Sequence, residues 1–178
     1  MKNLLFIVPI LIFTAFTIPG WYEFKDYKGR FSVNVPNQKG MTERIDTIET
    51  SFGKVDYHTF FYQPADPNAE NKLYQITYID YPKEMFPIDS TELISEFLTT
   101  TVEAANESIK GKLMYVDNIK ISNYAGKLWR SDYNKGNAVI KSKCVLVQNR
   151  LYTVQVATTK KRSINHEMDL FLDSFQKF

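Results

Sequence analysis

Residues 138–158 read AVIKSKCVLVQNRLYTVQVAT, and this stretch decides the fold class. Two runs rich in Val, Leu and Tyr, 138–148 and 151–158, flank the short polar pair Asn149-Arg150. β-Branched and aromatic residues favour strands, because they pack well on a pleated and half-buried surface. Two such runs separated by two turn residues predict an antiparallel hairpin. The stretch therefore predicts two long neighbouring strands joined by a tight turn.

Working outward, the same pattern predicts more strands that follow one another directly along the chain. On the N-terminal side of the hairpin we expect a turn at 134–137, a strand at 127–133, a turn at 123–126 and a strand at 113–122. Earlier runs predict strands over the ranges 21–27, 31–35, 43–50, 54–62 and 73–81, with a polar loop at 63–72. Directly consecutive strands usually pair antiparallel, so we expect a mainly antiparallel sheet.

Two amphipathic helices are expected beside this sheet. In the first, Asp89 would be the N-cap and Glu92 the partner of a capping box, and Lys110-Gly111 would end the helix. The second would start near Ser163. Its inward residues would be Ile164, Met168, Phe171, Leu172 and Phe175. The predicted fold class is therefore α+β, a mainly antiparallel β-sheet flanked by α-helices in layers.

The N-terminus has the features of a secretory signal peptide. Residues 1–20 read MKNLLFIVPILIFTAFTIPG, with Lys2 as the one charge and an apolar run over 4–18. A membrane-spanning helix needs about 20 apolar residues, which is more than this run offers. We expect cleavage after Gly20 and a single domain over 21–178, exported to the periplasm or secreted. An uncleaved segment that tethers the domain to the membrane is the alternative.

Composition excludes several classes of protein. The chain has 22 Lys and Arg against 20 Asp and Glu, so the basic excess typical of nucleic-acid binders is missing. One Cys and two His are too few for a disulfide scaffold or a Cys/His zinc site. We expect Cys144 to be a buried structural cysteine, and His58 and His166 to be surface or rim residues.

The sequence offers little catalytic chemistry. There is no Gly-rich phosphate loop and no nucleophile elbow. Ser51 and Lys54 match the S-x-x-K spacing, but that chemistry needs both residues on one helix face and a strand is expected there. The acidic residues Asp80, Asp89 and Glu92 are better explained as a strand end and a helix cap. We therefore expect no catalytic residues, no cofactor and no metal.

Aromatic residues, at 15% of the chain, are the one positive lead toward a binding function. Tyr and Trp beside Arg are typical anchors of protein interfaces. The candidate contact patch is Tyr124, Trp129, Arg130 and Tyr133. The alternative is that these aromatic residues fill the second face of the sheet under the last helix.

Four segments of the chain resemble the PsbP-like superfamily, which is named for an extrinsic subunit of photosystem II. They are Gly29-Arg-Phe-Ser-Val-Asn-Val-Pro36, Tyr78-Ile-Asp-Tyr-Pro82, Asn149-Arg-Leu-Tyr152 and Phe171-Leu-Asp-Ser-Phe175. The resemblance covers nearly all of 21–178 and implies an antiparallel sheet flanked by helices. Because characterised relatives are non-catalytic binding subunits, it also favours binding over catalysis.

We therefore expect a non-catalytic binding or accessory domain of the bacterial cell envelope. Its partner would be an envelope protein, with membrane contact only through an uncleaved N-terminal segment and no contact with nucleic acid. The second hypothesis is a carrier of a small apolar molecule or lipid, with an aromatic-lined cavity between helix and sheet. A hydrolase that uses dispersed residues is the third.

Overall fold

The computed structural model describes residues 20–50, 53–87 and 90–178. Apart from Gly20, the expected signal peptide lies outside the described residues, as do Ser51 of the S-x-x-K match and the expected N-cap Asp89. In the described part of the chain, no helix combines the length and the apolar character that crossing a membrane requires.

The order of elements follows the expected sequence of strands with a helix after the first half and another near the end. The first half contains β1 (Tyr22–Asp26), β2 (Phe31–Val35), β3 (Thr42–Thr50), β4 (Gly53–Tyr62) and β5 (Leu73–Asp80), and the second half contains α1 (Thr91–Ser108), β6 (Lys112–Ile121), β7 (Tyr124–Tyr133), β8 (Ala138–Val147), β9 (Arg150–Thr159), α2 (His166–Asp173) and β10 (Gln176–Lys177). Short 3₁₀ turns at Lys83–Met85 and Lys160–Arg162 precede the two helices.

The described strands form two sheets in which every pairing is antiparallel. The large sheet has seven strands in the order β3-β4-β5-β9-β8-β7-β6, and the small sheet has three in the order β1-β2-β10. Residues 138–158 do form the predicted pair of long strands, with Cys144 opposite Thr153. The predicted α+β class is confirmed.

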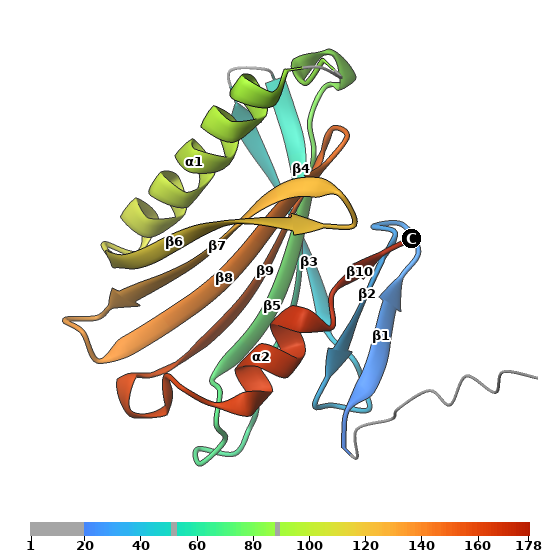
Figure 1. Cartoon of the computed structure of the whole chain (residues 1–178). Coiled ribbons are helices and arrows are strands. Elements are labelled where there is room, and N and C mark those ends of the chain that lie inside the picture. Colours follow the sequence, from blue (N-terminus) through green and yellow to red (C-terminus); the bar gives the residue numbers. More distant parts are fainter. Residues whose placement is uncertain (1–19, 51–52, 88–89) are drawn as a thin grey trace, which may run out of the picture.

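These elements stack in layers around the large sheet. Helix α1 covers one face of it, while α2 and the small sheet lie on the opposite side (Figure 1). Successive side chains of a strand point to opposite faces, so each strand of the large sheet serves both layers. We call the side under the small sheet and α2 the aromatic face, and the other side the α1 face.

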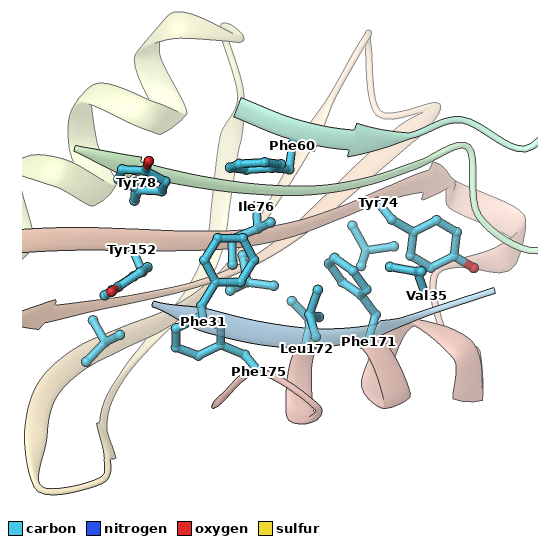
Figure 2. Packing of buried hydrophobic residues seen from close by; sticks show 14 of the residues in the cluster. Phe31, Val35, Phe60, Tyr74, Ile76, Tyr78, Tyr152, Phe171, Leu172 and Phe175 are labelled. Atoms are coloured by element: carbon cyan, nitrogen blue, oxygen red, sulfur yellow. The ribbon is translucent and has the colours of Figure 1, made fainter. Parts of the chain in front are cut away.

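The aromatic face carries the main core of the molecule, and Phe31 of β2 lies at its centre (Figure 2). Phe31 is fully buried, and its ring centroid lies 5.4–6.5 Å from those of five other rings. Those rings belong to Phe24, Phe60, Tyr78, Tyr152 and Phe175. Such ring pairs add about 0.5–1.5 kcal/mol each to the free energy gained from burial, so Phe31 joins the two sheets strongly.

The turn between β1 and β2 is fastened to the large sheet by Arg150 and Tyr152. Arg150 donates through Nε and Nη2 to both carboxylate oxygens of Asp80 at 2.6 Å, and through Nη1 to the carbonyl of Lys28 at 3.0 Å. Tyr152 Oη donates to the carbonyl of Gly29 at 2.6 Å. A Cβ atom on Gly29 would lie within 2.6–2.8 Å of three side chains, so the close approach of this turn requires glycine.

Several predicted boundaries are wrong by a few residues, for local reasons. Helix α1 starts after Ser90 and stops at Ser108, with Lys110 rather than a glycine at positive φ (50°). The Lys110 and Gly111 amides then bond back to the carbonyls of Glu107 and Asn106, which satisfies the end of the helix. The hairpin turns are Ser122-Asn123 and Gln148-Asn149, so both Tyr124 and Arg150 belong to strands.

The start of the last helix is also later than predicted. Asn165 is its N-cap and accepts from the Met168 amide at 2.8 Å, so the helix begins at His166. Ile164 precedes the cap and is 94% exposed, which contradicts its expected inward position. The other four expected core residues, Met168, Phe171, Leu172 and Phe175, are buried on the aromatic face as predicted.

Candidate functional site

A cavity of about 550 Å³ lies between α1 and the large sheet. Its floor comes from the middle of β5 and β9, two neighbouring strands near the centre of the sheet. Its wall comes from the second half of α1. Ligand sites of proteins usually measure about 300–1,000 Å³, so this α1 cavity has the size of a small-molecule site.

The floor of the α1 cavity is polar, although it belongs to central strands. Gln75 and Thr77 of β5 lie beside Thr153 and Gln155 of β9, and the antiparallel register places Gln75 opposite Gln155 and Thr77 opposite Thr153. Gln155 Nε2 donates to Ser142 Oγ at 3.0 Å, and Gln75 Nε2 lies 3.4 Å from Gln155 Oε1. The four side chains form a patch of amide and hydroxyl groups under the helix.

The walls of the cavity combine small helical residues with aromatic rings. Thr101, Ala104 and Ala105 face the sheet from α1, and their small side chains leave the space open. The aromatic residues of the lining are Tyr57, Tyr81, Phe97 and Trp129. Phe97 contacts Tyr81 with ring centroids 5.2 Å apart, so one end of the cavity is closed by packed rings.

No described residue that lines the α1 cavity carries a charged side chain. Two further hydroxyls are buried on the same face beside it: Thr59 lies opposite Thr77 and Ser131 lies opposite Ile140. Neither has a hydrogen-bond partner in the described part of the chain. The lining of the α1 cavity is therefore partly polar but uncharged, which suits hydrogen bonding better than acid–base chemistry.

Cys144 lies on this face beside Trp129 and is buried as expected. Burial raises the pKa of its thiol to about 11, and a contact with Lys127 only partly opposes that effect. A thiol of that pKa stays protonated at neutral pH, so it is a poor nucleophile. Cys144 packs in the core and does not offer reactive chemistry to the cavity.

The candidate contact patch of the sequence analysis does not form one surface. By the alternation along β7, Trp129 and Tyr133 lie on the α1 face, whereas Tyr124 and Arg130 lie on the aromatic face. Trp129 is 1% exposed, and it packs with Leu98 and Val102 of α1 rather than under the last helix. Tyr124 is half-buried at the margin of the main core.

Arg130 is engaged by its own strand. Its Nε donates to Asp132 Oδ1 at 3.0 Å, and Lys160 donates to the other carboxylate oxygen. Burial alone would raise the pKa of Asp132, but the two cations together outweigh burial and hold it below its usual range. The charge of Arg130 is thus already compensated within the molecule.

A second polar group lies at the end of the aromatic face, around Tyr78. The ring of His58 stacks on Tyr78 with centroids 4.4 Å apart, and Arg150 lies 4.5 Å from the Tyr78 centroid. His58 is 5% exposed and bonds through Nδ1 to Glu43 at 3.2 Å, which contradicts its expected surface position. His166, in contrast, is exposed at the start of α2.

This group fastens the fold and does not resemble a catalytic site. Asp80 is paired with Arg150 rather than with another carboxylate, and Tyr152 is bound to the backbone. Among the described residues, His, Cys, Asp and Glu do not gather in threes as a metal site would require. The α1 cavity is therefore the stronger candidate for a functional site.

A cavity between helix and sheet is part of only the second hypothesis from the sequence, which names none of the polar floor residues, although the floor left a signal. The residues Leu73, Gln75, Thr77 and Ile79 alternate along one face of β5, and two of them are polar in a strand expected to be central. Thr153 and Gln155 repeat the pattern in β9. Polar residues at matching positions of two central strands indicate a face that is not fully covered.

Comparisons with known proteins add evidence about the fold. No family model matches the sequence, and no curated protein matches it. The chain is similar in structure to cyanobacterial PsbP (CyanoP) from Synechocystis sp. PCC 6803, with a TM-score of 0.55, 13% identity and coverage of 93% of this chain and 96% of that chain. The implied PsbP-like fold is thereby confirmed.

A weaker likeness links the chain to a second solved structure. It is a protein of unknown function from Pseudomonas aeruginosa, PA94, described as a putative regulator. The TM-score is 0.44 at 12% identity, with coverage of 83% of this chain and 88% of that chain.

Proposed function

From a PsbP-like fold with an uncharged cavity under α1, we propose that this protein is a non-catalytic binding domain that holds a small organic molecule in that cavity. The observation that carries the proposal is the contrast between the cavity's size and the lack of charged side chains in its described lining. A volume of about 550 Å³ fits a molecule of a few hundred daltons. General acid–base and nucleophilic catalysis most often use a histidine, a carboxylate, a lysine or a thiolate, and the described lining contains none of these.

We also propose that the domain is exported and acts in the cell envelope. The support is the sequence of residues 1–20, with its lysine and apolar run. An envelope protein that docks on the domain is the remaining candidate partner. The exposed apolar residues Leu113, Met114, Tyr115 and Val116 of β6, at one edge of the large sheet, favour such a partner.

Native mass spectrometry of the protein purified gently from its own host tests the proposal. We expect a discrete added mass of a few hundred daltons. The same spectrum of intact mass tests export, since cleavage after Gly20 removes the first 20 residues. A bare protein, or one that carries a second polypeptide instead, would contradict the small-molecule proposal.

Two neighbouring positions of α1 provide a matched pair of variants. Ala104 lines the cavity and Glu103 does not, and both are exposed helical residues. In Ala104→Trp the indole occupies the mouth of the cavity, so we expect the added mass to disappear. Glu103→Trp places the same side chain outside and should keep it.

A further inference from the structure

The charge of the cavity's surroundings restricts what it can hold. A buried carboxylate, phosphate or ammonium group costs several kcal/mol unless an opposite charge or several hydrogen bonds compensate it. The described lining offers no Lys, Arg, His, Asp or Glu to supply that compensation. A charged group inside the cavity would therefore meet no opposite charge, and the uncharged floor alone would have to compensate it.

The floor nevertheless offers more hydrogen-bonding capacity than the protein uses. A glutamine side chain has two N–H donors and one acceptor oxygen. Gln155 donates to Ser142, while the contact between Gln75 and Gln155 is long, at 3.4 Å. The hydroxyl of Thr153 makes no hydrogen bond in the described part of the chain, so it adds another donor and acceptor at the floor.

The wall is suited to an apolar body. Phe97, Tyr81 and Trp129 present ring surfaces, and Ala104 and Ala105 present methyl groups. Burial of apolar area contributes about 25 cal/mol per Å², so this part of the cavity would supply most of the affinity. The amides and hydroxyls of the floor would then orient the ligand.

We infer that the α1 cavity selects uncharged small molecules that combine an apolar body with one or two hydroxyl, carbonyl, amide or aromatic amine groups. The inference rests on the proposed function, because it names the class of molecule that the same site would take. It excludes fatty acids, phosphates and amino acids as ligands of this cavity.

Two fluorescent probes with one ring system test the selectivity. N-Phenyl-1-naphthylamine is uncharged, and 1-anilinonaphthalene-8-sulfonate adds a single sulfonate to the same rings. The protein is titrated with each probe, and the binding that Ala104→Trp abolishes and Glu103→Trp keeps is taken as cavity binding. We expect cavity binding of the uncharged probe at least about tenfold tighter than that of the sulfonate.

A change of charge at the floor should reverse this preference. Gln155→Lys places an ammonium group in the cavity, so we expect the sulfonate probe to gain affinity and the uncharged probe to lose it. Gln155→Leu removes the amide without adding charge and is the control. Thermal unfolding of each variant verifies that it is folded before it is titrated.

The outcomes separate this inference from the proposed function. Equal cavity binding of both probes would leave the binding domain standing and overturn the selectivity for uncharged ligands. If Ala104→Trp reduces the binding of neither probe, neither probe occupies the cavity, and the proposed function itself is overturned. Tight cavity binding of the uncharged probe alone, with reversal in Gln155→Lys, supports both.

Discussion

The two faces of the large sheet have opposite designs. On the aromatic face, rings of β4, β5 and β9 pack against Phe31 and Phe171 in the main buried core (Figure 2), and we call this core the closed layer. On the α1 face, the same strands present Gln75, Thr77 and Thr153 to a cavity. We call the α1 side, with its cavity, the open layer. The same strands thus take part in both layers, and we expect the closed layer to contribute more to the stability of the fold than the open layer does.

The largest expected difference between the faces is in the loss of stability when one phenylalanine side chain on each face is replaced by alanine. Phe31→Ala removes five ring contacts and leaves a cavity in the closed layer, so we expect a loss of about 3–5 kcal/mol in the free energy of unfolding. Urea denaturation measures it. Phe97→Ala, at the half-buried wall of the open layer, should cost about 1–2 kcal/mol. Equal losses would mean that the two layers are equally important for stability.

A smaller effect is expected from the fastening of the β1–β2 turn to the closed layer. Asp80→Asn breaks the paired hydrogen bonds to Arg150, which is 8% exposed, but the Asp80 side chain is half-exposed. We therefore expect a loss of about 1–2 kcal/mol in the free energy of unfolding. Asp46→Asn breaks the exposed Arg44–Asp46 pair, and it should cost less than about 0.5 kcal/mol. A similar loss in the free energy of unfolding for both variants would show that the Asp80–Arg150 pair stabilises the fold no more than an exposed ion pair does.

Tyr78 tests how complete the closed layer is. Its hydroxyl is buried without a hydrogen-bond partner in the described part of the chain, so Tyr78→Phe should stabilise the protein slightly, by up to about 1 kcal/mol at pH 7. A destabilised Tyr78→Phe would show that the hydroxyl does have a partner, such as an ordered water.

The same residue predicts a dependence on alkaline pH. Burial, with a smaller contribution from Asp26, raises the pKa of Tyr78 to about 12, above the value near 10 of an unfolded chain. The folded state therefore holds the phenolic proton more tightly, and the stability it contributes is complete below pH 10 and is lost between pH 10 and 12. Urea denaturation at several pH values between 10 and 12 should show that the free energy of unfolding falls less in Tyr78→Phe than in the parent protein. Equal declines would place the alkaline loss on other tyrosines, such as Tyr74, whose pKa burial also raises.

The smallest effect is expected on the open face. Thr153→Val replaces a hydroxyl that has no hydrogen-bond partner among the described residues, so the free energy of unfolding should change by less than about 0.5 kcal/mol. Thr158 of the same strand is 2% exposed and donates to the carbonyl of Glu70 at 2.6 Å. Thr158→Val should cost about 1–2 kcal/mol. Calorimetry of the two variants measures both changes in the free energy of unfolding. A large loss in Thr153→Val would mean that the cavity floor contributes to the stability of the fold.

Patterns within one strand or helix could be predicted from the sequence, whereas the cavity between helix and sheet could be raised as a hypothesis but not located. The alternation of 138–158 predicted a long hairpin, and the stripe from Met168 to Phe175 predicted a buried helix face. The cavity depends on how far α1 stands from the sheet, and that distance follows from tertiary packing such as that of Leu98 and Val102 with Trp129. No local pattern encodes it, apart from the polar residues of the floor.

The errors at single residues have a similar origin. The proposed patch joined Trp129 and Arg130 because they are adjacent in sequence, but adjacent residues of a strand point to opposite faces. Ile164 fits the helical spacing, so the sequence predicts an inward position for it. The cap at Asn165 instead starts the helix at His166, and Ile164 lies before the helix. A cap and a strand register therefore overrode hydrophobic spacing.

The pairing of β10 with β2 has a consequence for the order in which the protein folds. Gln176 lies opposite Ser32, so a strand near the beginning of the described chain finds its partner nearly at the end of the sequence. Contacts between such distant segments slow folding, because closing a long loop costs conformational entropy before the contact is gained. During synthesis the aromatic core cannot close until Phe171 and Phe175 have left the ribosome. Closure of the aromatic core is therefore a late step, because it joins segments that are made far apart in time.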